Sequence, residues 1–159
     1  MELDHEFTVP APVDQAWSAL LDAERVARAM PGATLDSTDG DTHTGRLRVR
    51  LGAMTITYRG TARLAGADKP ARTLTVEAEG KEARGSGTAS AVIRLRLTET
   101  DDGTHVAVHI TLDVTGRPAQ FGRPILAEAA AKLITRFTKS LTETLEPPTT
   151  KPTAPAPPA

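Results

Sequence analysis

The 159-residue sequence contains no cysteine, which excludes disulfide bonds, thiolate metal sites and a cysteine nucleophile. Aromatic side chains make up only 3% of the residues, so Val, Leu, Ile and Ala must build most of the interior. No apolar run approaches the ~20 residues that cross a bilayer as a helix. The first residues, MELDHEFTV, are charged where a signal peptide would be apolar. These absences favour a soluble cytoplasmic protein.

Charge of one sign is also lacking, because the net charge is −1. Such a balance gives no overall attraction to a polyanion, and we therefore expect no nucleic-acid binding. With 39% apolar residues, residues 1–146 are long enough to bury one core without covalent staples. We interpret them as one domain.

Most of the chain alternates apolar and polar residues with the period of a β-strand. Residues 2–9 predict a first strand, with Leu3, His5, Phe7 and Val9 on one side. Further alternating segments lie between residues 33 and 114, separated by turn sequences such as Asp39-Gly40-Asp41 and Asp101-Asp102-Gly103. Gly52 predicts a tight hairpin between two of these strands. A later strand, with Leu74, Val76 and Ala78 facing inward, is followed by a predicted loop or bulge that Gly80, Gly85 and Gly87 surround. Short spacings without intervening helices favour an antiparallel meander of about six strands after the first one.

Three segments have helical periodicity instead. Residues 13–21 and 22–30 predict two short helices, the first with Val13, Ala16, Trp17, Leu20 and Leu21 on one face. The third and longest helix is predicted over residues 124–146, with Pro124 as its first residue. Its apolar stripe consists of Leu126, Ala130, Leu133, Phe137, Leu141 and Leu145, flanked by Ile134. The opposite face is predicted to be exposed to water and carries Glu128, Lys132, Arg136, Lys139 and Glu143.

The order of strand, two short helices, about six strands and one long helix predicts an α+β fold. A curved antiparallel sheet of about six or seven strands around the long C-terminal helix, a helix-grip arrangement, satisfies every pattern together. Residues 147–159, PPTTKPTAPAPPA, offer no apolar face to bury. We expect them to form a disordered Pro-rich tail.

No arrangement of residues indicates a metal or catalytic site. His105 and His109 would lie about 13 Å apart along a regular strand, too far to share one zinc ion. Gly85-Ser86-Gly87 lacks the spacing of a nucleophile elbow, and the pattern favours a bulge or loop there. The carboxylates fall mainly in turns or on outward faces, although a single buried acid or Tyr58 acting in a pocket stays open.

Arginines gather on the predicted outer face of the sheet, at Arg46, Arg48, Arg50, Arg59, Arg63, Arg94 and Arg96. Glu77 and Glu79 share that face, so cross-strand ion pairing is the favoured explanation. Docking to acidic lipid headgroups or to a protein partner is the alternative, and Arg46, Arg48 and Arg50 are its best candidates.

Several short motifs together resemble one known family. They are Val9-Pro10-Ala11-Pro12, Trp17, Leu20, Asp22, Met30-Pro31-Gly32, Gly52, Gly116, Ala119-Gln120-Phe121-Gly122 and the terminal helix. This set, over nearly all of residues 1–146, resembles the CoxG family of carbon monoxide dehydrogenase subunits, within the START-like (SRPBCC) helix-grip superfamily. The resemblance implies an apolar cavity between sheet and long helix and no conserved catalytic machinery. It also implies association with molybdenum hydroxylases and a link to membrane quinone.

We therefore expect a non-enzymatic protein that binds an apolar ligand, with menaquinone as the model, for a partner molybdenum hydroxylase. Peripheral contact with the inner face of the membrane fits this role, but the tail has no bulky apolar residue with which to insert. The residues expected to line the cavity are Trp17, Met30, Met54, Ile56, Tyr58, Ile93, Ile110, Phe121, Leu126, Leu133 and Phe137. Tyr58 could donate a hydrogen bond to a ligand carbonyl. A cyclase- or dehydratase-like enzyme of the same superfamily and an assembly factor that binds only protein are the alternatives.

Overall fold

The computed structural model describes residues 1–145. Its elements are, in chain order, β1 (Glu2–Val9), α1 (Val13–Leu21), α2 (Ala23–Ala29), β2 (Ala33–Asp39), β3 (Thr42–Leu51), β4 (Met54–Asp68), β5 (Thr73–Glu82), β6 (Thr88–Thr100), β7 (Gly103–Val114), the 3-10 helix η1 (Arg117–Phe121) and α3 (Gly122–Thr144). The expected Pro-rich tail, residues 147–159, lies outside the described residues.

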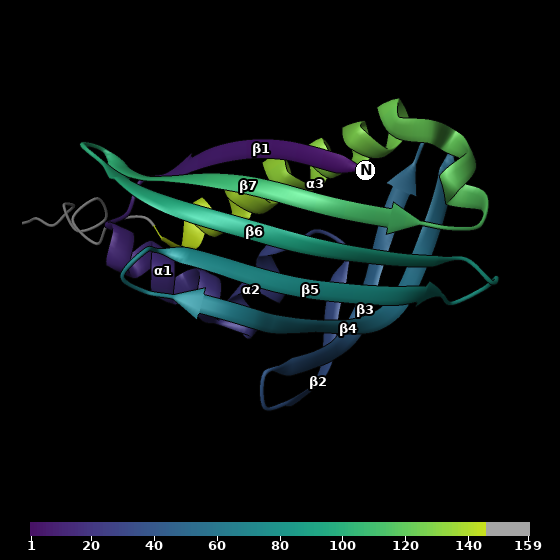
Figure 1. Cartoon of the computed structure of the whole chain (residues 1–159), viewed down its shortest axis with the longest axis horizontal. Helices are drawn as coiled ribbons and strands as arrows, with labels where there is room; N and C mark the ends of the chain where they lie inside the picture. Colours follow the sequence, from purple (N-terminus) through teal and green to yellow (C-terminus); the bar gives the residue numbers. More distant parts are fainter. Residues whose placement is uncertain (146–159) are drawn as a thin grey trace, which may run out of the picture.

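One antiparallel sheet contains all seven strands, in the order β1-β7-β6-β5-β4-β3-β2. Only β1 departs from sequence order, because the chain passes through α1 and α2 before it returns as a meander. Figure 1 shows the sheet curving in front of α3, with α1 and α2 at one end of the molecule. The predicted α+β helix-grip fold is confirmed.

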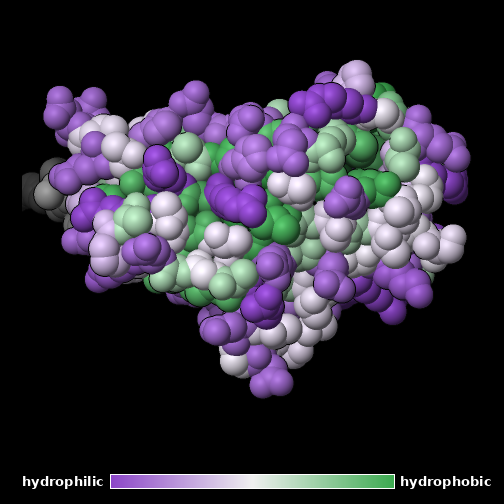
Figure 2. All heavy atoms as spheres, viewed as in Figure 1, coloured by the Kyte–Doolittle hydropathy of each residue, from purple (hydrophilic) through white to green (hydrophobic). Residues whose placement is uncertain are grey.

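The alternation of the sequence sets the two faces of the sheet. Leu47 lies opposite Tyr58 and Val49 opposite Ile56 on the inner face, which is the face toward α3. On the outer face, Arg46 lies opposite Arg59. Figure 2 shows hydrophilic residues spread over this outer face, with hydrophobic residues between them. Each strand therefore presents apolar side chains to the helices and polar ones to solvent.

Three glycines let the sheet bend sharply. Gly45 pairs with Gly60, and Gly60 pairs with Gly80, so the three form one row across β3, β4 and β5. A Cβ atom on Gly60 would overlap the backbone carbonyl oxygen of Glu79, and one on Gly45 would overlap that of Thr34. The close backbone approach thus requires glycine at both positions. Gly80, predicted to border a loop or bulge after the strand, lies inside β5, which continues to Glu82.

The short helices begin where the sequence predicts them. β1 ends at Val9, before the prolines, and the Asp22 carboxylate caps α2 by accepting from the backbone N–H groups of Glu24 and Arg25. Leu21, predicted on the buried face of the first helix, is 39% exposed. The helix ends at that residue, so Ala19 takes the inward position in its last turn instead.

The long helix starts two residues earlier than predicted. It begins at Gly122, directly after η1, and Pro124 is its third residue rather than its first. Its predicted wet face is confirmed, since Glu128, Lys132 and Arg136 are exposed. Among the helices of residues 1–145, none combines the length and the hydropathy needed to cross a membrane.

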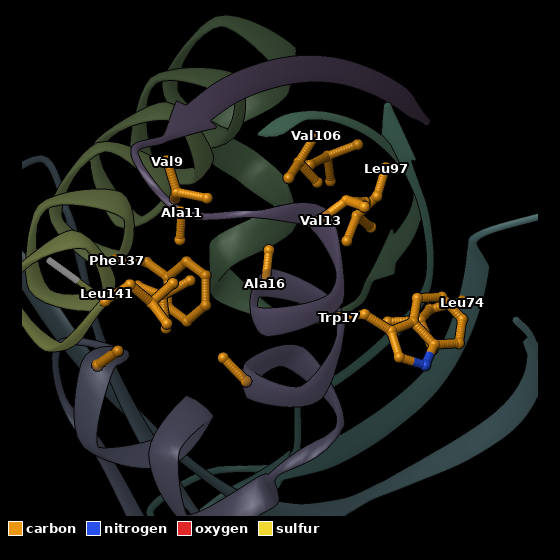
Figure 3. Close-up of a cluster of buried hydrophobic side chains, with 14 residues drawn as sticks. Val9, Ala11, Val13, Ala16, Trp17, Leu74, Leu97, Val106, Phe137 and Leu141 are labelled. Carbon is orange, nitrogen blue, oxygen red and sulfur yellow. The ribbon is translucent and has the colours of Figure 1, made fainter. Parts of the chain in front are cut away.

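The main core lies at the α1–α2 end of the molecule. Figure 3 shows Phe137 and Leu141 of α3 facing Val9, Ala11 and side chains of α1. The rings of Phe7 and Phe137 meet edge to face, with centroids 6.1 Å apart. The buried members of the cluster are Val9, Ala11, Val13, Ala16, Trp17, Ala19, Ala29, Leu74, Leu97, Val106, Val108, Phe137, Leu141 and Leu145. From α3 this core takes only the C-terminal half.

Candidate functional site

Apolar side chains also cover the inner face away from the main core, but there they are only half-buried. We call this set the inner apolar surface; its members are Leu47, Val49, Val76, Ala78, Ala91, Leu112, Leu126, Ala130 and Leu133. None of them belongs to the core cluster or to the partly buried residues packed against it. The inner face therefore has a closed end beside α1 and α2 and a less covered remainder.

The position of α3 explains this difference. Its main contacts with the sheet are to β1 on one side and β3 on the other, and it also packs against α2 and η1. The Arg123 guanidinium fixes the start of the helix by donating to the Glu2 carbonyl of β1, at 2.8 Å. At the other end, Arg25 of α2 donates to Thr144. Because the helix bridges the two sides of a curved sheet, the middle strands receive fewer contacts from it.

Two of the residues expected to line a cavity lie in the main core. Trp17 is 5% exposed and Phe137 is 6% exposed, and both belong to the buried cluster. Three more, Met30, Ile93 and Ile110, are partly buried and pack against that cluster. These five residues therefore gather toward the closed end, and their contact with a ligand stays a prediction.

The other six expected residues lie toward the opposite end. Met54, Ile56 and Tyr58 follow the β3–β4 turn on the inner face, and the Phe121 ring lies against that turn at Gly52. Ile56 is buried, whereas the other three are half-buried. Leu126 and Leu133 lie on the N-terminal half of α3 and are also half-buried. The structure thus brings the β3–β4 hairpin and η1 together, beside the start of α3.

A polar pair interrupts the apolar inner face near this end. Tyr58 of β4 lies directly opposite Glu82 of β5, and both side chains are half-buried. Burial raises the pKa of the Tyr58 hydroxyl, and the negative charge of Glu82 raises it further. Tyr58 is therefore a neutral hydroxyl over the physiological range, available as a hydrogen-bond donor.

Sequence reasoning missed Glu82. The alternation Leu74, Val76, Ala78 continues through Gly80 to Glu82, whereas the predicted strand ends at the glycine. Continuing the two-residue alternation from Ala78 through Gly80 to Glu82 would have placed this carboxylate on the inner face.

A second polar group on the inner face is His5 of β1, between Leu3 and Phe7. Its Nε2 atom is the one buried side-chain nitrogen or oxygen without a hydrogen-bond partner among residues 1–145. A buried unpaired group of this kind costs free energy unless a water or a ligand atom satisfies it.

Among residues 1–145, two of the seven arginines on the outer face form ion pairs. Arg63 forms an ion pair with Glu77 across β4 and β5, which confirms the expected cross-strand pairing there. Arg46 pairs with Asp36 of β2 at 3.0 Å. For Arg48 and Arg50 the described part of the chain contains no ion-pair partner. Of the three arginines considered for docking, Arg46 is thus already engaged.

The two histidines of β7 bind carboxylates of β1 rather than a metal. His105 Nε2 lies 2.6 Å from Glu6, and the two ring nitrogens of His109 lie 2.6 Å from Asp4 and 2.5 Å from Glu2. Within residues 1–145, no group of three potential metal-ligating side chains is suitably placed.

Comparison with known proteins gives one family. The model of the CoxG family of carbon monoxide dehydrogenase subunits matches residues 6–146. No curated protein matches the sequence.

Solved structures with the same fold are numerous. A conserved protein from Geobacillus kaustophilus superposes with a TM-score of 0.81 at 20% identity, over 91% of this chain and 95% of its own. The ZhuI aromatase/cyclase from Streptomyces sp. R1128 gives a TM-score of 0.64 at 15% identity, over 98% and 99%. The protein Ms6760 from Mycobacterium smegmatis gives 0.63 at 17%, over 91% and 90%. At these identities the likeness establishes the fold alone.

Proposed function

Because the chain belongs to the CoxG family of carbon monoxide dehydrogenase subunits, we propose that it is a non-enzymatic carrier of an apolar ligand, with a menaquinone-like quinone as the model. The carrier would serve a molybdenum hydroxylase of the carbon monoxide dehydrogenase type and link it to the quinone pool of the membrane. Family membership and fold support ligand binding in general, and the quinone and the partner enzyme are the specific content of the proposal.

The single observation that carries the proposal is the half-buried inner apolar surface. Six apolar side chains of the sheet and three of α3 lie on this surface without joining the core, and a domain that only packed its own sheet and helix would bury them. An apolar guest between α3 and the middle strands would remove this surface from water. The helix spans the sheet from β1 to β3, which leaves the middle strands as the wall of such a site.

The energetics are adequate for a prenylated ring. At about 25 cal/mol per Å², a ligand that buries about 400 Å² of apolar surface gains about 10 kcal/mol before ordering costs. Micromolar affinity corresponds to about 8 kcal/mol. The balance suits a carrier, which must release its ligand as well as bind it.

The proposal is tested by measuring the binding of an apolar ligand and the weakening of that binding when a larger side chain fills the site. We expect a menaquinone with a short prenyl chain to quench Trp17 fluorescence saturably, whereas small polar acids do not. Replacing Met54, on the inner face beside the β3–β4 turn, by Trp should fill the site and weaken binding measured by calorimetry. Native mass spectrometry of protein purified from its own host should show a copurifying lipid-like ligand.

A matched control uses the neighbouring residue. Thr55 is exposed on the outer face, so Thr55→Trp adds the same side chain without entering the site and should leave binding unchanged. A folded wild-type protein that binds no apolar ligand saturably and yields none on extraction would contradict the proposal and favour an assembly factor.

A further inference from the structure

The inner face carries the carboxylate of Glu82, and the residues next to this carboxylate are glycines. The Glu82 side chain lies over the β5–β6 hairpin, where its backbone N–H donates to the Gly87 carbonyl. A Cβ atom on Gly87 would overlap one carboxylate oxygen, and Cβ atoms on Gly85 and Gly116 would come within 2.8 Å and 3.0 Å of the carboxylate. Three glycines from two separate loops thus leave room for this one side chain.

This carboxylate has no partner of its own. No hydrogen bond or ion pair among residues 1–145 reaches either oxygen of Glu82, although the residue is only half-exposed. Solvent reaches its oxygens, because neither is among the buried unpartnered polar atoms of residues 1–145. Glu79 is exposed on the outer face of the same strand. A half-buried acceptor without a donor is suited to an incoming hydroxyl group.

Tyr58 supplies the complementary group. It lies directly opposite Glu82 in the ladder, so the two side chains leave adjacent strands on the same face. Its neutral hydroxyl can donate to a ligand oxygen. Gly80, two residues before Glu82, lies close beside Tyr58, since a Cβ atom at this position would be only 3.2 Å from the Tyr58 Cβ atom. Glycine leaves only backbone at this point. Position 80 therefore adds no side chain between the Tyr58–Glu82 pair and the inner apolar surface.

We propose that Tyr58 and Glu82 bind the polar head of the apolar ligand and select a hydroxyl-bearing head, of the quinol or phenol type, over a quinone. The inference rests on the proposed function and specifies which form of ligand the carrier prefers. A hydroxyl donates to the Glu82 carboxylate and accepts from Tyr58. A quinone carbonyl can only accept, so it satisfies Tyr58 but places its lone pairs against the carboxylate.

The experiment compares the two forms of one ligand. A short-chain menaquinone and its chemically reduced quinol, kept under nitrogen, are titrated by calorimetry into the full chain and into Glu82→Gln, Tyr58→Phe and Glu79→Gln. The wild type should bind the quinol about tenfold or more tighter than the quinone, the usual effect of one hydrogen bond to a charged group. Glu82→Gln should remove this preference, because an amide can donate to a carbonyl. Tyr58→Phe should weaken both forms by similar factors, and Glu79→Gln should change neither.

The outcomes separate this inference from the function on which it rests. Equal binding of both forms by the wild type, unaltered in Glu82→Gln, would overturn the assignment of the head group while the carrier function stands. A preference abolished by His5→Leu but retained in Glu82→Gln would also overturn it, because the head would then lie beside β1. Binding of neither form would contradict the carrier function itself. Both substitutions at the pair are close in size to the native residue, and thermal unfolding checks that each variant is folded.

Discussion

At the scale of single residues, the edge of the sheet formed by β1 and β7 contains a charge cluster that depends on one histidine. His109 lies between Asp4 and Glu2, with one ring nitrogen toward each carboxylate. Both nitrogens can donate only when the imidazole is protonated. The hydrogen bond to Asp4, and to a smaller extent the one to Glu2, raises the pKa of His109. The hydrogen bond from His109 lowers the pKa of Glu2.

The resulting pH dependence has a definite sign. His109 should contribute stability that is fully present below its unfolded pKa of about 6.5 and is lost as pH rises through the higher folded pKa. Glu2 should contribute stability that is present above its unfolded pKa and is lost as pH falls through the lower folded one. The cluster is therefore most effective at mildly acid pH. NMR titration should give His109 a pKa above the ordinary histidine value of about 6.5, and Glu2→Gln should lower the pKa of His109. An unchanged midpoint in the variant would contradict the assignment.

At the scale of elements, α3 has two functions along its length. Its C-terminal half, with Phe137 and Leu141, completes the main core together with Leu145, the residue that caps the helix. Its N-terminal half, with Leu126, Ala130 and Leu133, faces the sheet but is only half-buried. The same apolar stripe thus supports packing at one end and the proposed ligand site at the other.

This division predicts unequal costs of truncation. Phe137→Ala should lower the free energy of unfolding by about 3–5 kcal/mol, because it leaves a void in a sealed core beside Phe7. Leu133→Ala, one turn earlier on the same stripe, should cost clearly less, because no sealed void forms at a half-buried position. Urea denaturation of both variants measures the difference. Similar losses for the two would show that the N-terminal half is packed as tightly as the core.

At the scale of the whole molecule, the closed end and the less covered remainder of the inner face are joined by one bent sheet. The row of Gly45, Gly60 and Gly80 lets β3, β4 and β5 bend. The helix α3 contacts both β1 and β3 on the concave side of the sheet (Figure 1). A buried hydrogen bond from Thr104 to the Ala11 carbonyl, 2.8 Å long, anchors β7 to the segment that leads into α1. The closed end thus contains the packed core, and the ligand site that we propose lies outside it.

A global consequence is that ligand binding should stabilise the fold. For a ligand that binds only the folded state, the free energy of unfolding rises by about 2.7 kcal/mol at a concentration one hundred times the dissociation constant. Thermal unfolding with the short-chain menaquinol should therefore shift to higher temperature in a concentration-dependent manner. Met54→Trp should show a much smaller shift than Thr55→Trp at equal ligand concentration. Equal shifts in the two variants would indicate that the ligand binds elsewhere.

The sequence determined the elements and their faces by itself, because alternation and helical periodicity are local properties. It predicted the strands on either side of Gly52, the wet face of α3 and the helix-grip architecture. Its errors were local as well: Pro124 as the first helical residue, Leu21 as a buried residue and Gly80 as the end of a strand.

Tertiary structure alone decided which apolar residues are sealed and which are left half-buried. Trp17 and Phe137 are apolar like Leu126 and Leu133, yet only the first pair is buried in the main core, and the second pair is half-buried. The pairing of Tyr58 with Glu82 likewise depends on the register of β4 and β5, which pair across the turn at residues 69–72 and around a bulge between Leu64 and Gly66. Register and coverage depend on contacts between residues distant in sequence, and periodicity carries no information about them.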